Sequence, residues 1–573
     1  MADYDLVVRG GTIVDGSGGA PFAGDIAIRG DRIVAVGNCP GTAAETVDAS
    51  GKFVTPGFVD VHTHYDGQAI WSEEMSPSSS HGVTTVVMGN CGVGFAPCRK
   101  EDHATLIKVM EGVEDIPGVV MAEGLPWDWE TFPEYLDALD ARRRDIDVAA
   151  YLPHSPLRVY AMGARGAERE PATADDLARM QELAREAMEA GALGFATSRL
   201  MIHKTMDGQH IPSFEADNAE LVAIAQALKD TGKGVVQMVL NLYAGWDAEL
   251  SHLIKVVESS GRPATFTYAV GNTGPVTPDV DLALVNAANA SGAKISPQIL
   301  PRPIGIVAGF DLSTHPFCLC PSYLPIANLP LEQQLEHLRD PAFRARLIAE
   351  APEEGHPLAQ LSRNWDWLFP LSDPPNYEPA PETSVGAQAR AQGRSPEEVA
   401  MDLLMNGGDG QGMLYNALGN FNNGKLDALY DLMQRDDVVL GLGDGGAHYG
   451  AICDASYPTF LLTYWTRDRA GPRLDWAKAI RALSATPAEA VGLHDRGRLA
   501  PGYKADLNVI DAQRLALHRP VVKRDLPGGG RRLDQGATGF AATIVSGEVI
   551  RRDDRATGAR PGRLVRGSQA AAA

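Results

Sequence analysis

The chain has 573 residues, of which 44% are hydrophobic, so it can form one large elaborated domain or two to three domains, and extensive disorder is excluded. Its 51 basic and 73 acidic residues give a formal net charge of −22, which argues against nucleic acid and acidic membranes as partners. The start of the chain resembles no secretion signal, and six cysteines in so long a chain do not suggest a disulfide framework, so we expect a cytoplasmic protein.

Both ends of the chain are expected to form β-structure. Residues 4–8 lead into a Gly-rich turn, residues 25–29 alternate in character, and Gly30-Asp31 makes a hairpin turn before residues 32–36. Residues 505–510 and 542–550 look like strands around turns. These segments predict one small sheet domain built from both termini, followed by a tail after residue 557 that we expect to be disordered.

A short apolar run, 53–59, leads into the segment Asp60-Val61-His62-Thr63-His64. In an extended strand, residues i and i+2 point to the same side, so His62 and His64 can bind one metal ion together. A lone His-x-His also occurs by chance on exposed strands. The apolar run before it favours a metal site at the C-terminal end of a buried strand.

The middle of the chain alternates short apolar strands with amphipathic helices. Strands are expected at 82–88, 193–197 and 234–239, and helices at about 174–189 and 218–230. Thr173 and Gly191 are expected to cap the first of these helices. Repeated β-then-α units predict a parallel sheet, and the histidines at the end of its first strand favour a closed barrel. Residues of about 320–430 break this rhythm, which predicts an inserted, partly helical subdomain over the barrel mouth or a loose surface insertion.

Two further positions follow apolar strands. Cys91, in Gly89-Asn90-Cys91-Gly92, offers a thiolate that suits an ion such as zinc, although a buried apolar cysteine is the alternative. Asp444 ends the apolar run 438–443 and could bind the metal, take a proton from water and return it to the leaving group; a turn-forming Asp before Gly is the alternative. His448 is expected to contact the reacting oxygen or to orient Asp444.

Five more side chains are candidates for substrate binding at the mouth. His154 and His203 both follow apolar strands, but ordinary hydrogen-bonded histidines would look the same. Arg158, Arg199 and Lys204 could pair with a carboxylate of the substrate, because a guanidinium suits bidentate contact.

Taken together, these motifs resemble the amidohydrolase superfamily, in its N-acyl-D-amino acid deacylase branch (D-aminoacylase-like, amidohydrolase family 3). The resemblance spans nearly the whole length and rests on five segments: 56–66, 89–92, Asp444-Gly445, 484–488 and 497–507. It implies an α/β fold: a distorted (β/α)₈ TIM barrel over 57–496, with the insertion, and a small β-sandwich domain from 1–56 and 497–573.

The resemblance also implies a site and a reaction. His62, His64, Cys91 and Asp444 look like metal ligands, Asp444 also looks like the acid/base, and activated water would attack an amide carbonyl. The fifth and sixth strands, however, lack the histidines typical of this branch, and Gln237 occupies about the first of these positions. We therefore expect one zinc ion rather than two.

The leading hypothesis is hydrolysis of an N-acyl-D-amino acid or a related amide. Hydrolysis of a cyclic amide, imide or lactone is a second enzyme hypothesis, and a non-catalytic amidohydrolase-like scaffold is a third. The partner in the first two is a small molecule. Neither nucleic acid nor a membrane is expected as a partner, and a homo-oligomer stays open.

Overall fold

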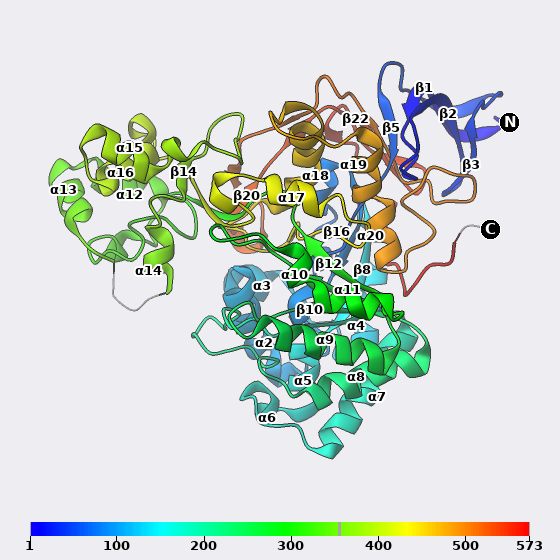
Figure 1. Ribbon diagram of the computed structural model, residues 1–573, viewed down its shortest axis with the longest axis horizontal. Coiled ribbons are helices and arrows are strands. Elements are labelled where there is room, and N and C mark those ends of the chain that lie inside the picture. Colours follow the sequence, from blue (N-terminus) through cyan, green and yellow to red (C-terminus); the bar gives the residue numbers. More distant parts are fainter. Residues whose placement is uncertain (1, 353–356, 572–573) are drawn as a thin grey trace.

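The computed structural model describes residues 2–352 and 357–571 and is built around a parallel barrel (Figure 1). The sheet order is β16-β12-β11-β10-β9-β8-β7-β6, and all neighbouring strands are parallel. In chain order the strands are β6 (Phe58–Asp60), β7 (Val83–Met88), β8 (Asp147–Pro153), β9 (Gly194–Ser198), β10 (Val235–Val239), β11 (Ala264–Thr267), β12 (Ile295–Ile299) and β16 (Val439–Leu440). Eight strands in this order confirm the predicted barrel fold.

The barrel closes through backbone hydrogen bonds at its mouth rather than through pairing of its first and last strands, β6 and β16. In the described residues no strand pairing joins β16 to β6. Instead, the backbone N–H of His64 donates to the carbonyl oxygen of Gly445 at 2.8 Å, and that of Asp444 donates to the carbonyl oxygen of His62 at 3.1 Å. The segments that carry the predicted ligands are therefore hydrogen-bonded to each other.

Amphipathic helices alternate with the strands, and the two helices predicted in detail are confirmed. Helix α7 (Ala174–Ala190) has a capping box between Thr173 and Asp176 and ends at the left-handed Gly191, and α8 (Asn218–Thr231) follows β9. The other longer helices around the barrel are α2 (His103–Glu114), α4 (Phe132–Asp140), α5 (His154–Met162), α9 (Trp246–Ser260), α11 (Ala283–Ala290) and α19 (Trp476–Leu483).

The apolar run 53–59 does not form one strand. It divides into β5 (Phe53–Pro56), which pairs with strands from both termini, and β6, which opens the barrel. Gly57 lies between them and donates its N–H to the carbonyl oxygen of Asp506 at 2.8 Å. The chain thus passes directly from the terminal sheet into the barrel, which apolar character alone did not show.

The terminal sheet has nine strands and draws on both ends of the chain. Its strands besides β5 are β1 (Tyr4–Ile13), β2 (Phe22–Arg29), β3 (Arg32–Gly37), β4 (Ala43–Asp48), β17 (Leu507–Ile510), β22 (Phe540–Val545), β23 (Glu548–Arg552) and β24 (Arg555–Ala556). Val8, Ile26, Val54, Leu507 and Ile544 are among the side chains in its core.

A separate lobe interrupts the barrel between β12 and β16, and its helices lie apart from the barrel at the left of Figure 1. It contains a three-stranded sheet of β13 (Ile304–Ala308), β15 (Leu414–Gly419) and β14 (Leu368–Pro370), with helices α12 (Leu331–Arg339), α13 (Pro341–Ala349), α15 (Val385–Gln392) and α16 (Pro396–Met405). At its base, Ser313 Oγ donates to Asp115 Oδ2 at 2.8 Å. That the lobe shapes the substrate pocket stays a prediction.

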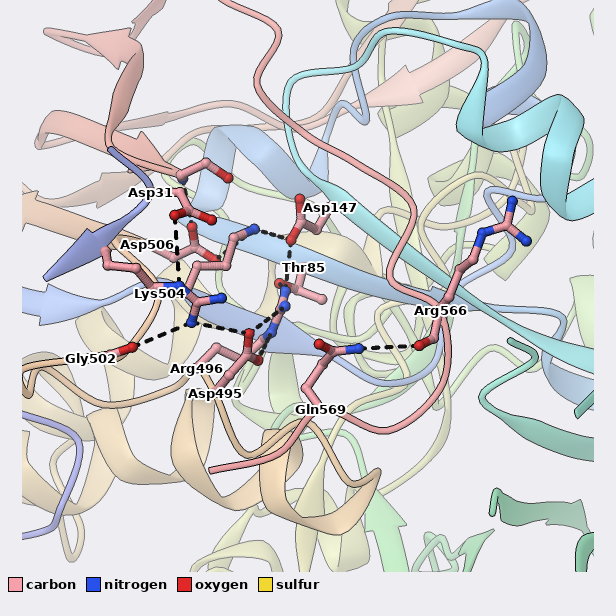
Figure 2. A network of polar contacts seen from close by, with 12 residues as sticks. Asp31, Thr85, Asp147, Asp495, Arg496, Gly502, Lys504, Asp506, Arg566 and Gln569 are labelled. Atoms are coloured by element: carbon pink, nitrogen blue, oxygen red, sulfur yellow. Dashed lines mark hydrogen bonds and ion pairs between the residues drawn. The ribbon is translucent and has the colours of Figure 1, made fainter. Parts of the chain in front are cut away.

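A buried ionic network joins the barrel to the terminal sheet (Figure 2). Arg496 and Lys504 both contact Oδ2 of Asp147, the first residue of β8; the Arg496 Nη1 distance is 2.8 Å. The tail lies beside this network and is not disordered up to residue 571: the N–H of Val565 donates to the carbonyl oxygen of Val148 at 2.8 Å. None of the helices in the described residues has the length and apolar character needed to cross a membrane.

Candidate metal centre

Three of the predicted ligands meet at the barrel mouth. His62 and His64 follow β6, and Cys91 follows β7 in a tight turn. Their donor atoms all lie within 4.8 Å of one another, and all three side chains are buried. The sulfur of Cys91 is 3.4 Å from Nε2 of His62 and 3.9 Å from Nε2 of His64. Each strand end thus supplies a donor to one common point.

The carboxylate of Asp444 reaches the same point from the end of β16. Its Oδ1 lies 3.6 Å from Nε2 of His62 and 3.6 Å from Nε2 of His64. This oxygen is buried and accepts no hydrogen bond from the described residues. Zinc binds nitrogen and oxygen at about 2.0–2.2 Å and sulfur at about 2.3 Å in tetrahedral sites, so neighbouring ligand atoms stand about 3.3–3.6 Å apart. The donor set and its spacing therefore fit a divalent cation.

Three side chains at this point are carried on unusual backbone. Cys91, Asp444 and His448 have φ values of 57°, 47° and 49°, in the left-handed region that non-glycine residues seldom adopt. Gly446, between the last two, has a φ of 89°, and a Cβ there would lie 2.7 Å from the carbonyl oxygen of His64. Strained backbone of this kind is retained where the surroundings enforce it, often at functional sites.

A hydrogen-bond chain through Gln298 orients His62. Nε2 of Gln298, on β12, donates to Oγ1 of Thr265 at 3.1 Å, so the oxygen of Gln298 faces Nδ1 of His62 at 3.0 Å. That oxygen accepts the proton on Nδ1, which leaves Nε2 of His62 with a lone pair directed at the cluster. Thr265 belongs to β11, the sixth strand, where the branch would carry a histidine.

Gln237, on the fifth strand, supports Cys91 in a similar way. Its Oε1 accepts a hydrogen bond from the backbone N–H of Cys91 at 3.2 Å. Gln237 on the fifth strand therefore supports Cys91, and Thr265 on the sixth supports His62 through Gln298; neither residue is placed as a ligand itself.

Burial sets the protonation of the imidazoles. Desolvation lowers the pKa of His62 to about 4, of His64 to about 3 and of His448 to about 4. They are therefore neutral near pH 7, as ligands must be. Burial and the nearby carboxylates of Glu114 and Asp444 raise the pKa of the Cys91 thiol, whereas a bound cation has the opposite effect.

His203 and Lys204 lie on the loop after β9. Burial lowers the pKa of His203 to about 3, with smaller contributions from His448, His64 and His62. Its Nδ1 is 2.9 Å from Oγ of Ser198. Lys204 is half-buried and forms no ion pair within residues 2–352 and 357–571.

The other three candidates for substrate contact are engaged with glutamates. Nε2 of His154 and Nε of Arg158 approach the same Oε1 of Glu220, at 2.8 and 3.0 Å. Nε of Arg199 lies 3.0 Å from Oε2 of Glu249. A substrate carboxylate would have to compete with these buried or nearly buried partners.

One residue at the cluster was not predicted. Glu114, at the end of α2, is buried, and its Oε2 lies 3.4 Å from Nε2 of His64 and 3.3 Å from Nε2 of His448. In the sequence it is a polar residue near a helix end, before Ile116-Pro117-Gly118, and nothing distinguishes it from a solvated glutamate. Only the packing of α2 against the loop that follows β16 reveals it.

The chain is similar to known proteins along most of its length. A family model described as the amidohydrolase family matches residues 45–551. An uncharacterized protein of Mycobacterium tuberculosis (strain ATCC 25618 / H37Rv) is 29% identical over 602 residues, covering 96% of this chain and 92% of the relative. N-acyl-D-glutamate deacylase of Alcaligenes xylosoxydans xylosoxydans is 26% identical over 520 residues, covering 89% and 87%.

A solved structure shares the fold along nearly its full length. N-acyl-D-glutamate deacylase from Bordetella bronchiseptica, solved with zinc and a phosphonate inhibitor, superposes with a TM-score of 0.65 at 24% identity, covering 98% of this chain and 99% of that one. The family match spans most of this chain, including every predicted ligand. The chain belongs to the amidohydrolase family and is a hydrolase of carbon–nitrogen bonds other than peptide bonds.

Proposed function

We propose that this chain hydrolyses the amide bond of an N-acyl-D-amino acid or a related amide with one divalent ion, zinc, bound by His62, His64, Cys91 and Asp444. The observation that carries the proposal is the meeting of these donors at the barrel mouth, where Cys91 Sγ and Asp444 Oδ1 each lie 3.4–3.9 Å from Nε2 of the two histidines. Two imidazoles, a thiolate and a carboxylate suit a borderline-soft ion such as zinc.

The reaction needs a nucleophile and a proton carrier. A bound divalent ion supplies Lewis-acid chemistry, which activates water and polarises the amide carbonyl. Asp444 removes a proton from the attacking water and returns it to the amide nitrogen as the carbon–nitrogen bond breaks. Its side chain is 21% exposed, whereas those of His62 and His64 are 2% and 1% exposed, so Asp444 is the member of the cluster that a substrate can reach.

His448 is the second residue open to the substrate. Its side chain is 28% exposed, and the strained turn from Asp444 to His448 holds both on one short loop. A neutral imidazole carries one N–H, which His448 directs to the developing charge on the carbonyl oxygen.

The substrate class rests on a relative and on the charges around the mouth. The relative of this chain from Alcaligenes is named N-acyl-D-glutamate deacylase. Arg158 and Arg199 are engaged with glutamates, while Lys204, next to His203, is without an ion pair in the described residues. Lys204 is therefore the cation that we assign to the carboxylate of an N-acyl amino acid.

The test combines a metal measurement with a substrate panel. Purified protein is expected to contain about one zinc per chain, and His62→Ala to lose both zinc and turnover, since one of about four ligands is gone. His518→Ala, which changes an exposed histidine, is the control. N-acyl-D-amino acids should be hydrolysed faster than their L-isomers and than cyclic imides or lactones. Full activity after complete removal of metal would refute the proposal.

A further inference from the structure

Glu114 is a buried carboxylate without hydrogen-bond partners. Its side chain is 1% exposed, and neither Oε1 nor Oε2 receives a hydrogen bond from the described residues. Buried charges in proteins are paired or bind metal, because desolvating an isolated carboxylate is very costly. Glu114 can therefore stay ionised only if a positive charge lies beside it.

No arginine or lysine pairs with Glu114 in the part of the chain that the structure describes. Its contacts are the two imidazoles, His64 at 3.4 Å and His448 at 3.3 Å. His64 faces the metal cluster with the same Nε2 that faces Glu114. One oxygen of Glu114 thus stands beside a proposed ligand at the separation expected between two ligands of one ion.

The backbone fixes this placement. The N–H of His448 donates to the carbonyl oxygen of Glu114. Gly450, two residues on, donates its N–H to Oδ2 of Asp115 at 3.2 Å. The end of α2 is thereby fastened to the loop that carries Asp444, so Glu114 cannot move away without breaking both contacts.

The fifth and sixth strands explain why a ligand from α2 is needed. Their residues at the cluster, Gln237 and Thr265, accept hydrogen bonds from the Cys91 N–H and from Gln298. They supply neither charge nor imidazole to the ion. Any further donor must come from another element, and α2 is the element that offers one.

We propose that Glu114 is a further ligand of the divalent ion, contributing a carboxylate oxygen beside His64. This inference rests on the proposed function, since it requires the ion. With a second carboxylate the site would be more negative than with the other four donors alone, so the site would bind the cation more tightly.

The experiment compares zinc affinity in Glu114→Gln with that in the parent protein. Glutamine keeps the size of the side chain but removes its charge. Competition with a chromophoric chelator should show zinc affinity weakened by more than about 100-fold, beyond the range of about 10–100-fold typical for loss of an outer-shell partner of a ligand. The absorption spectrum of the cobalt-substituted protein should shift as well.

Glu111→Gln is the matched control. It lies one turn earlier on α2 and accepts a hydrogen bond from the N–H of Gly118 at 2.9 Å. Its zinc affinity and cobalt spectrum should equal those of the parent. Unchanged affinity and an unchanged spectrum in Glu114→Gln would overturn the inference, and a parent protein that binds no zinc would instead overturn the proposed function.

A crystal structure of the zinc-loaded parent protein decides the matter if Glu114→Gln does not fold. A Glu114 oxygen at about 2.0–2.2 Å from the ion supports the inference. An oxygen beyond 3 Å, hydrogen-bonded to His64 or His448 instead, contradicts it and leaves Glu114 as a partner of those imidazoles.

Discussion

Asp444→Asn is expected to stop turnover while the protein stays folded. Asparagine tolerates the left-handed φ of 47° at this position and can still offer an oxygen to the ion, but it cannot accept and return a proton. Loss of general acid–base catalysis should lower kcat by about 10²–10⁴. The measurement is kcat together with bound zinc. A zinc-replete variant within about tenfold of the parent, well short of that range, would shift the proton transfer to His203 or His448.

Gln298→Leu tests whether the Gln298 amide orients His62. Leucine has a similar size but cannot accept the proton on Nδ1 of His62, which lies 3.0 Å from the Gln298 oxygen. Loss of such an orienting contact should weaken zinc binding about 10–100-fold. Chelator competition gives the affinity, and thermal unfolding of the metal-stripped variant verifies that the barrel persists. Parent-like affinity would show that packing alone orients the ring.

Lys204→Met tests recognition of a substrate carboxylate. If the ammonium pairs with that carboxylate, KM for N-acyl amino acids should rise about tenfold, equivalent to about 1.4 kcal/mol. KM for the matching N-acyl amines, which have no carboxylate, should stay the same. Lys229→Met, on the exposed side of α8, is the control. An equal rise for both substrate types would mean that Lys204 only supports the loop.

At the scale of single residues, the sequence predicts those site residues that directly follow a strand, because the end of the strand shows where they lie in the barrel. His62, His64, Cys91 and Asp444 each follow an apolar strand, and parallel strands of one barrel end at a common mouth. Glu114 gives no such signal, because its place depends on how a helix end packs against a loop more than 300 positions later. Arg199 shows the converse: its strand-end position is informative, but its buried partner Glu249 is not visible in the sequence.

Among the elements, the loop after β16 is the one on which the site depends most. Gly446 has a φ of 89°, and any Cβ would lie 2.7 Å from the carbonyl oxygen of His64. Gly446→Ala should therefore displace His64 and weaken zinc binding, beyond the strain of about 1–2 kcal/mol that the left-handed backbone alone imposes.

Gly274 offers a matched control for this loop. Its φ is 88°, and a Cβ there meets nothing within 4 Å. Gly274→Ala should show the strain in its free energy of unfolding but no change in zinc affinity. Equal zinc affinity in the two variants would mean that the loop and His64 move independently.

Local signals predict elements well where the cause of the structure is local. The capping box of Thr173 and the left-handed Gly191 define α7 to within one residue of the prediction. The division of 53–59 into β5 and β6 has a non-local cause, the pairing of β5 with β17 some 450 residues later. The lobe begins at β13, before the predicted start at about residue 320, because β13 pairs with β15 and not with a barrel strand.

For the whole molecule, buried histidines predict loss of stability in acid. Burial lowers the pKa of His315 to about 3 and that of His81 to about 4, both below the unfolded value of 6.5. For these two side chains the unfolded state binds more protons, so their contribution to the free energy of unfolding is fully present above pH 6.5 and falls as the pH drops toward 4. Each such histidine contributes a slope of up to about 1.4 kcal/mol per pH unit.

His315→Phe should reduce this slope by about one proton, because phenylalanine fills the aromatic site beside Phe310 and Tyr323 without titrating. The measurement is urea unfolding of metal-stripped protein between pH 4.5 and pH 7, conditions chosen to span the window below the unfolded pKa of about 6.5. An unchanged slope in His315→Phe would contradict the expected burial of a neutral imidazole, because buried carboxyls such as Asp60, whose raised pKa gives the opposite slope, are the same in both proteins.

The central claim is that one ion at the barrel mouth supports amide hydrolysis, and titration of zinc into the metal-stripped protein tests it most directly. Initial rates on an accepted N-acyl-D-amino acid are measured against zinc added per chain. The account predicts that activity rises linearly to one equivalent and then stays constant, because His62, His64 and Cys91 form one cluster and Asp444 lies 3.6 Å from Nε2 of both histidines. Full activity without added zinc, or a rise that continues to two equivalents, would contradict it.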